Sequence, residues 1–368
     1  MKIEEIDKNF QAKSIGNREF LFKSVTEKPF ELDGFPWRDE MPETPFHRIP
    51  VERLKGKVND GVIWLGRNST GGTCRFRTDS TMIALRATLE QPSDMNHMPR
   101  GGSAGFDLHM VTPTGTVQIG NCFPGPQVNE LEACMIYADL PAGLEREFIL
   151  TFPLYGGAFT VEIGLLPGAT LTEPSPWKID KPIVFYGSSI TQGGCASRPG
   201  NCYPNLLCRA LKARQVNLGF SGSGRGEEAM AELINELDPS LFVFDYDHNA
   251  PDVEYLRKTH EPFFKIIRAK HPELPVIFAS KCDIWPYDPS YDNFSERREV
   301  IRTTFRNAVN AGDKHVYFVD GETLFGAEDR EACCVDRCHP NDLGFYRMYK
   351  TFLPVVKRAL AESGYHFD

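Results

Sequence analysis

The chain has 368 residues, 41% of them hydrophobic and 25% charged, which is typical of a globular protein with about two domains. Asp and Glu number 50 against 41 Lys and Arg, and this net charge of −9 argues against a general nucleic-acid binder or a protein of anionic membrane surfaces. No apolar run is long enough to cross a membrane, and the polar residues 1–8 do not resemble a signal peptide. We therefore expect a cytoplasmic protein, with no nucleic-acid or membrane partner, whose ten cysteines are mostly buried free thiols.

Residues 1–177 have the pattern of an all-β domain. Short runs with β-branched or aromatic residues are interrupted by Gly and Pro, at residues 61–65, 81–87, 105–111 and 159–164. Many short strands without long helices predict a β-sandwich, of the jelly-roll kind. A connector rich in proline follows, and we place the domain boundary near residue 178.

Residues 178–368 alternate between apolar runs and helical periodicity. The expected strands are apolar throughout, as in a parallel sheet covered on both faces, and comprise residues 182–186, 215–219, 241–245, 275–279 and 316–319. The expected helices are residues 203–213, 227–237, 253–270, 294–311 and 343–362. This order predicts an α/β domain with a doubly wound, flavodoxin-like parallel sheet.

The ends of the predicted strands carry the polar residues of this domain. Ligands of such sheets bind beyond the carboxyl ends of the strands. There the sequence places Ser189, the glycine-rich segment 219–226 and Asn249, and Asp336 and His339 precede the last helix.

This set has the groups that acyl transfer by a serine requires. Ser189 needs a base to become a nucleophile, and His339 can supply it, oriented by Asp336. The backbone N–H groups of Ser189 and Gly222, with the side-chain amide of Asn249, can donate to an oxyanion.

The same residues carry a family resemblance. Residues 180–360 resemble the SGNH hydrolases, also called GDSL-like lipases and acylhydrolases, in four blocks that occur in the family's order. Ser189 matches the nucleophile, Gly222 and Asn249 match the oxyanion residues, and the run Asp336-Arg337-Cys338-His339-Pro340 matches the family's Asp-x-x-His-Pro. The resemblance implies the same roles for these residues here, with no metal and no organic cofactor.

Two blocks depart from the family pattern. Ser188 replaces the usual Asp before the nucleophile, which is not the acid of the triad. The run from Asp245 to Asn249 replaces Gly-x-Asn-Asp, and it puts Asp247 and His248 beside the oxyanion position as possible substrate contacts.

The longer runs at residues 186–193 and 245–251 resemble a two-domain subgroup with an N-terminal β-sandwich. This subgroup is similar to carbohydrate esterases and to some acyltransferases of secondary metabolism. This implies a serine esterase that removes a small acyl group, acetyl in the first place, from a small-molecule or oligosaccharide ester. One alternative is an acyltransferase with the same acyl-enzyme, in which an alcohol replaces water. Another is a non-catalytic carbohydrate-binding protein. A free sandwich edge would also allow a homo-oligomer.

Other conspicuous residues have open or structural interpretations. Arg198 either holds a substrate carboxylate or forms an ion pair. Ser103 fits Gly-x-Ser-x-Gly literally but lacks the strand before it and the helix after it, whereas His97 and the loop that follows could reach the active site from the first domain. The segment 222–226 lacks the last glycine of a dinucleotide fingerprint, and we expect His260 to be a packing residue.

Overall fold

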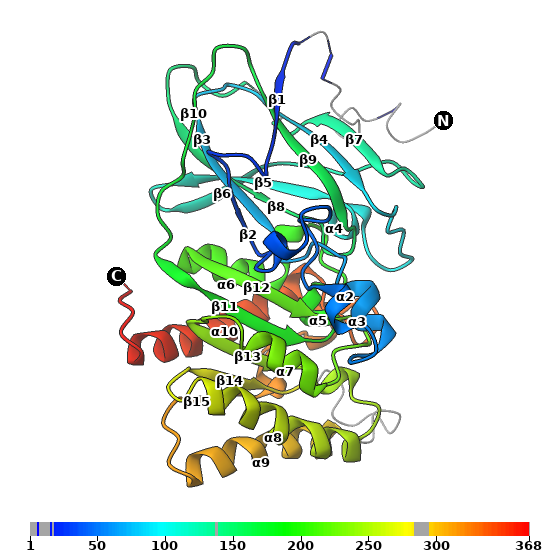
Figure 1. The fold of residues 1–368 in the computed structure, drawn as a ribbon, viewed down its shortest axis with the longest axis vertical. Coiled ribbons are helices and arrows are strands. Elements are labelled where there is room, and N and C mark those ends of the chain that lie inside the picture. Colours follow the sequence, from blue (N-terminus) through cyan, green and yellow to red (C-terminus); the bar gives the residue numbers. More distant parts are fainter. Residues whose placement is uncertain (1–5, 7–14, 17, 137–138, 283–293, 368) are drawn as a thin grey trace.

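The first half of the chain forms two antiparallel β-sheets (Figure 1). The computed structural model describes residues 6, 15–16, 18–136, 139–282 and 294–367, so most of the polar start at residues 1–8 lies outside the described residues. One sheet has the order β1-β9-β4-β7, and the other has the order β10-β3-β8-β5-β6 with β2 paired to β3. The strands are β1 (Leu21–Ser24), β2 (Glu31–Asp33), β3 (Thr73–Thr78), β4 (Ile83–Leu89), β5 (Phe106–Thr112), β6 (Gly115–Cys122), β7 (Glu130–Cys134), β8 (Arg146–Thr151), β9 (Ala158–Leu165) and β10 (Leu171–Thr172).

The inner faces of these two sheets supply one apolar core. Phe76, Phe106 and Phe148 of the second sheet are fully buried and share this core with Leu85 and Ile163 of the first. The rings of Phe76 and Phe148 stack with their centroids 5.5 Å apart. The arrangement confirms the predicted β-rich first domain.

Short helices interrupt the sandwich, and one of them corrects the sequence prediction. Residues 61–65, expected to be a strand, lie in α3 (Asp60–Leu65). The side chain of Asn59 caps this helix by accepting from the N–H of Val62 at 3.2 Å, and a capped start favours helix over strand. The other helical segments of this half are η2 (Arg38–Glu40), α2 (Val51–Leu54) and α4 (Arg100–Ser103).

The second half contains the predicted five-stranded parallel sheet, in the order β12-β11-β13-β14-β15. Counted from the first strand of this half, the order is 2-1-3-4-5, the flavodoxin-like arrangement. The five strands are β11 (Ile179–Gly187), β12 (Ala213–Gly219), β13 (Leu241–Asp245), β14 (Val276–Ala279) and β15 (Val316–Val319).

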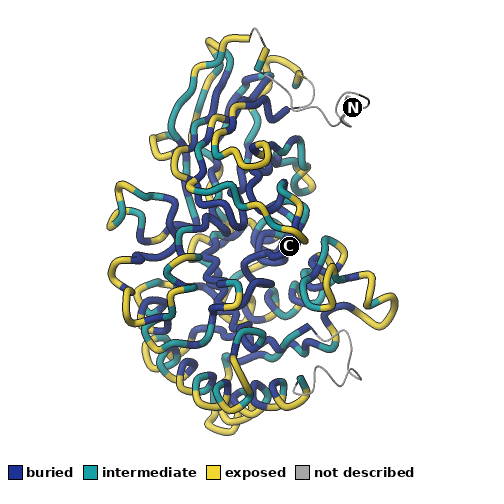
Figure 2. Tube along the Cα trace, turned by 90° about the vertical axis from the view of Figure 1, so that its right-hand side faces the viewer, coloured by how far each residue is buried: buried dark blue, intermediate teal, exposed yellow. Residues whose placement is uncertain are grey.

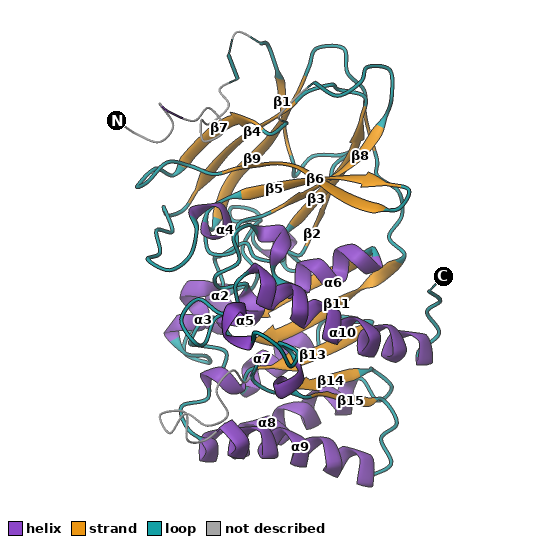
Figure 3. Ribbon diagram, turned by 180° about the vertical axis from the view of Figure 1, so that it is seen from behind, coloured by secondary structure: helices purple, strands orange, loops and turns teal. Residues whose placement is uncertain are grey.

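Helices cover both faces of this sheet (Figure 3). The helices α6 and α10 pack on one face, and α7, α8 and α9 pack on the other. Figure 2 shows the sheet as mainly buried and the outer turns as exposed. No helix of the described ranges is both long and apolar enough to span a bilayer. The helical segments are α5 (Ser189–Gln192), η3 (Pro199–Asn201), α6 (Tyr203–Leu211), α7 (Glu228–Ile234), η4 (Asp247–Asn249), α8 (Val253–Lys270), α9 (Phe294–Asn310), η6 (Gly321–Thr323), η7 (Arg330–Cys333) and α10 (Asp342–Glu362).

Part of the first half packs into the core of the second. Trp37, Ile49, Leu54 and Val62 are buried in the same cluster as Val216 of β12. The segment with α2 and α3 therefore covers a face of the parallel sheet, and the two halves share apolar core as well as surface.

Arg48 joins the two halves from a fully buried position. Its guanidinium donates to the carbonyl oxygens of Leu65 (2.7 Å) and Asn68 (3.0 Å) in the first half. It also donates to Asn217 (2.7 Å) and Gly219 (2.8 Å) at the end of β12. Burial lowers the pKa of Arg48 to about 9, and the carbonyl dipoles around it stabilise its charge.

Replacing Arg48 is expected to be costly, because four carbonyl groups at the junction of the two halves would each lose a hydrogen-bond donor. We expect Arg48→Met to lower the free energy of unfolding by about 3 kcal/mol or more, measured by urea denaturation. The matched control is Arg53→Met, since Arg53 also spans the halves by pairing with Glu236 at 2.6 Å but is 40% exposed. The control should cost less than about 1 kcal/mol. Equal losses in the two variants would contradict this assignment.

Candidate active site

The nucleophile predicted from the sequence lies at a tight turn between β11 and α5. Ser188 caps α5, its hydroxyl accepting from the N–H of Ile190 at 3.2 Å, so Ser189 is the first helical residue. A Cβ atom on Gly187 would lie 2.0 Å from Thr191 Oγ1 and 2.3 Å from the carbonyl oxygen of Asp245. Only glycine fits this turn, which holds the side chain of Ser189 at the carboxyl edge of the sheet.

Three side chains form a hydrogen-bonded chain at this edge. Ser189 Oγ lies 2.8 Å from His339 Nε2, and His339 Nδ1 lies 2.7 Å from Asp336 Oδ2. The backbone N–H of His339 donates to Asp336 Oδ1 at 2.7 Å. With its Nδ1 proton directed to the carboxylate, the imidazole presents Nε2 as the acceptor for the serine hydroxyl.

The surroundings keep Asp336 ionised. Partial burial by itself would raise the pKa of this carboxyl group, but hydrogen bonds from the backbone and ring of His339 outweigh it. The net effect lowers the pKa of Asp336 below its usual range. A carboxylate in this position fixes the imidazole and stabilises its protonated form.

The predicted oxyanion donors lie in the segments that follow β11, β12 and β13. Asn249, in η4 after β13, uses one amide hydrogen to donate to the carbonyl oxygen of Phe220 at 2.8 Å, which leaves the second hydrogen for a ligand. Gly222 has a φ of +66°, a left-handed conformation that favours glycine. Within the described residues, the backbone N–H groups of Ser189 and Gly222 have no hydrogen-bond acceptor.

Gln192 is a residue of this site that the sequence analysis did not single out. Its Oε1 accepts from the backbone N–H of Ser221 at 2.9 Å, and its Nε2 donates to Asn68 Oδ1 at 2.9 Å. Its carbonyl oxygen accepts from Thr70 Oγ1 at 2.7 Å. It thus joins α5, the loop of residues 220–226 that contains Gly222 (the oxyanion loop) and the first domain. No local motif reveals this set of partners.

A buried carboxyl group lies beneath the nucleophile helix. Asp245 Oδ2 accepts from Thr191 Oγ1 at 3.2 Å and from the hydroxyl of Tyr203 at 3.1 Å. Burial, and secondly the charge of Asp247, raise the pKa of Asp245 to about 7. Near neutral pH this group therefore titrates inside the fold.

The raised pKa of Asp245 predicts a pH dependence of stability. The folded protein retains a proton that the unfolded chain releases near pH 4, so this contribution is complete below about pH 4 and decreases as the pH rises toward about 7. Asp245→Asn cannot ionise. We expect its melting temperature, measured by calorimetry, to gain several degrees relative to the wild type between about pH 4 and pH 8. A constant difference across this range would contradict the shifted pKa.

Two of the three predicted substrate contacts have structural partners. Arg198 forms an ion pair with the fully buried Asp107 of β5, which favours the ion-pair alternative over a substrate carboxylate. Asp247 is buried, and its Oδ2 accepts from the backbone N–H of Lys281 at 3.0 Å. One carboxylate oxygen of Asp247 thus has a structural partner just after β14, and a contact between Asp247 and substrate stays a prediction.

His248, the third predicted contact, lies close to the triad. Its Nδ1 is 3.9 Å from Cys338 Sγ. Burial, with the positive charges of Lys281 and His339, lowers the pKa of His248 well below its ordinary value. A neutral imidazole at this place is available for a polar contact, and its role stays a prediction.

Two other residues have the structural roles expected of them. Ser103 is buried, and its hydroxyl donates to the carbonyl oxygen of Ser93 at 2.8 Å. His260 is buried in α8, with Nδ1 2.8 Å from Thr304 Oγ1 and its ring stacked on Phe244.

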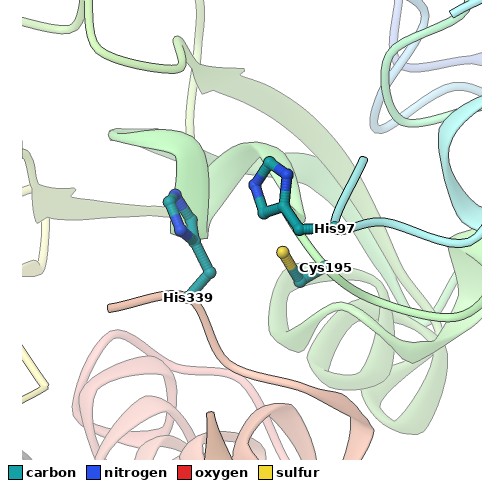
Figure 4. A group of neighbouring side chains, drawn as sticks. All are labelled: His97, Cys195 and His339. Carbon is teal, nitrogen blue, oxygen red and sulfur yellow. The ribbon is translucent and has the colours of Figure 1, made fainter. Parts of the chain in front are cut away.

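The first domain reaches the triad through His97 (Figure 4). The imidazole of His97 meets that of His339 edge to face at 5.6 Å between centroids, and its Nε2 is 4.0 Å from Asp336 Oδ2. One potential ligand atom from each of His97, Cys195 and His339 lies within 4.8 Å of the others. This nitrogen and sulfur set suits Zn²⁺, but an ion here would compete with the hydrogen bonds that His339 makes in the triad.

The cluster predicts an inhibitory rather than a supporting effect of zinc. We expect calorimetric titration to show one Zn²⁺ ion bound per chain, and EDTA to release it. Cys195→Ser and His97→Ala each remove a ligand and should weaken binding about tenfold or more. Zinc affinity unchanged in both variants would place the ion elsewhere.

Several solved structures share this architecture. A GDSL-like lipase from Bacteroides ovatus is 27% identical, with a TM-score of 0.83, over 93% of this chain and 98% of its own. The salicylyl-acyltransferase SsfX3 of a tetracycline biosynthetic pathway is 22% identical, with a TM-score of 0.72, over 94% and 98% of the two chains. An acetyl xylan esterase from Butyrivibrio proteoclasticus is 12% identical, with a TM-score of 0.58, over 93% and 99%.

Family models match both parts of the chain. No curated protein sequence matches this chain. Residues 20–171 match the N-terminal domain of SGNH-hydrolase-type esterases, and residues 180–357 match the GDSL-like lipase/acylhydrolase family. Together with the shared fold, these matches show that the chain belongs to the GDSL/SGNH esterase family, in the form that carries an N-terminal β domain.

Proposed function

We propose that this protein is a serine esterase that hydrolyses a small acyl ester on a polar carrier such as a carbohydrate. Acetyl is the acyl group we propose first. The observation that carries the proposal is the chain of hydrogen bonds from Ser189 through His339 to Asp336, with distances of 2.8 and 2.7 Å. A hydroxyl, an imidazole and a carboxylate in this order activate serine for attack on a carbonyl carbon.

In the first half-reaction, Ser189 Oγ attacks the ester carbonyl and its proton moves to His339 Nε2. The carbon–oxygen bond to the carrier then breaks, and His339 returns the proton to the departing alcohol. In the second half-reaction, water attacks the acyl-enzyme while His339 again accepts and returns a proton, which releases the acid and restores Ser189. Asp336 stabilises the imidazolium in both.

Charge on the carbonyl oxygen develops opposite three donors. These are the backbone N–H groups of Ser189 and Gly222 and the free amide hydrogen of Asn249. The hydrogen bond from Asn249 to Phe220 fixes the amide before substrate binds, so little reorganisation is needed in the transition state.

The acetyl and carbohydrate parts of the proposal rest on likeness. The acetyl xylan esterase shares the fold, and the family includes acylhydrolases. The acyltransferase SsfX3, which aligns over 94% of this chain, supports acyl transfer to an alcohol as the second candidate. A purely binding role is disfavoured because hydrogen bonds connect Ser189 to His339 and His339 to Asp336. We also propose a reducing compartment, the cytoplasm, because none of the ten cysteines forms a disulfide in the structure.

The test is acetate release from 4-nitrophenyl acetate and from acetylated mono- and oligosaccharides. We expect the wild type to cleave the aryl ester and at least one class of sugar ester, and Ser189→Ala to form no acyl-enzyme by mass spectrometry. Asn249→Ala should lower kcat about 10²- to 10³-fold through the loss of one oxyanion donor.

Ser103→Ala is the control, because Ser103 fits a nucleophile motif by sequence alone and should not matter for turnover. Acyl-enzyme on the Ser189→Ala variant would point to another nucleophile. Transfer of the acyl group to an added alcohol in preference to water would favour the acyltransferase.

A further inference from the structure

We propose that a cleft built by the first domain binds the alcohol half of the ester, and that its occupant is a neutral sugar ring stacked on Trp64. This inference rests on the proposed function and names the part of the chain that selects the carrier. The cleft has a volume of about 440 Å³, and all of its lining residues belong to the first half of the chain. The residues that matter here are Trp64, Asn68, Gln91, Ser93, Asp94 and Tyr155.

One wall of the cleft adjoins the nucleophile. A Cβ atom on Gly194, just after α5, would lie 2.9 Å from the hydroxyl oxygen of Tyr155, 3.1 Å from the carbonyl oxygen of Ser189 and 3.3 Å from His339 Cδ2. Asn68, in the same wall, accepts from Gln192 of α5 at 2.9 Å. Tyr155 and Asn68 thus connect this wall of the cleft to the segment that carries Ser189.

A second wall rests on the oxyanion loop. Asn59 Nδ2 donates to the carbonyl oxygen of Ser223 at 2.8 Å, which fixes the start of α3 against that loop. A Cβ atom on Gly61 would lie 2.0 Å from Ser223 Oγ, so α3 approaches the loop as closely as glycine permits. Trp64 lies one helical turn after Gly61 on this helix.

The chemistry of the lining fits a polyhydroxylated ring. Trp64 is 54% exposed, and the guanidinium of Arg67 lies over its ring at 5.8 Å from the centroid. The indole still offers apolar surface for the C–H groups of a sugar. Gln91 and Asp94 add an amide and a carboxylate. Polar groups of this kind can hydrogen-bond the hydroxyl groups of a sugar.

Two other classes of occupant fit less well. An acyl chain would need an apolar tunnel, whereas five of the ten residues that line this cleft are polar. The carboxylate of Asp94 disfavours binding of a phosphate or another anion in the cleft, because with this carboxylate present the lining has no excess of positive charge. Asp94 is itself held by Arg100 and by the backbone N–H of Gln127 at 3.2 Å, so it presents a fixed and already paired carboxylate.

The test separates binding of the carrier from the chemistry at Ser189. We expect Trp64→Ala to raise KM for the acetylated oligosaccharide that the wild type cleaves about five- to tenfold, with kcat/KM for 4-nitrophenyl acetate unchanged. Phe159→Ala is the matched control, because Phe159 is also an aromatic residue of the first domain, 50% exposed, and lines a different cavity. Phe159→Ala should change neither KM for the acetylated oligosaccharide nor kcat/KM for 4-nitrophenyl acetate.

A binding measurement does not depend on turnover. Xylotetraose and cellotetraose are titrated into the Ser189→Ala variant with and without Trp64→Ala, and binding is followed by calorimetry and indole fluorescence. Binding of a tetraose that is lost with Trp64 supports the cleft, even if no ester is cleaved and the proposed function fails. Three results would overturn the cleft: no binding of either tetraose, binding that survives Trp64→Ala, or equal loss of activity on the aryl ester and the sugar ester.

Discussion

The buried guanidinium of Arg48 is the interaction on which the arrangement of this molecule depends. It joins carbonyl groups of the first domain to those that end β12, and it lies 4.7 Å above the ring of Phe220 at the base of the oxyanion loop. A charged group is stable in this place only while carbonyl oxygens surround it. Any separation of the domains would break those hydrogen bonds, so the two parts are held in one geometry.

That fixed geometry makes the catalytic edge a joint product of both domains. The serine, histidine and carboxylate come from the α/β domain, but Gln192 behind them is held by Asn68 and Thr70 of the β domain. His97 also reaches the carboxylate side of the triad from the β domain. The sandwich therefore acts as one wall of the site, which gives a physical reason for the two domains to share a chain.

The points at which local sequence misled the interpretation or left it open have a common cause. Residues 61–65 contain apolar β-formers, yet the cap at Asn59 and packing on the parallel sheet make them helical. Arg198 and Asp247 both stand near the nucleophile or the oxyanion position along the chain, but each is bound by a partner distant in sequence, Asp107 and Lys281. Nearness along the chain identifies a candidate, and only the folded neighbourhood shows whether its charge is free.

The sequence by itself determined the α/β domain and the groups at its edge. Uninterrupted apolar strands and amphipathic helices are local signals, and helix α8 has the predicted bounds of residues 253 and 270. The glycine-hinged turn at Ser189 and the spacing of Asp336 and His339 are local as well. Tertiary structure alone decided the burial of Arg48, the role of Gln192 and the cleft beside Trp64. Each of these depends on contacts between residues far apart in the chain, and such contacts leave no periodicity or fixed spacing in a single sequence.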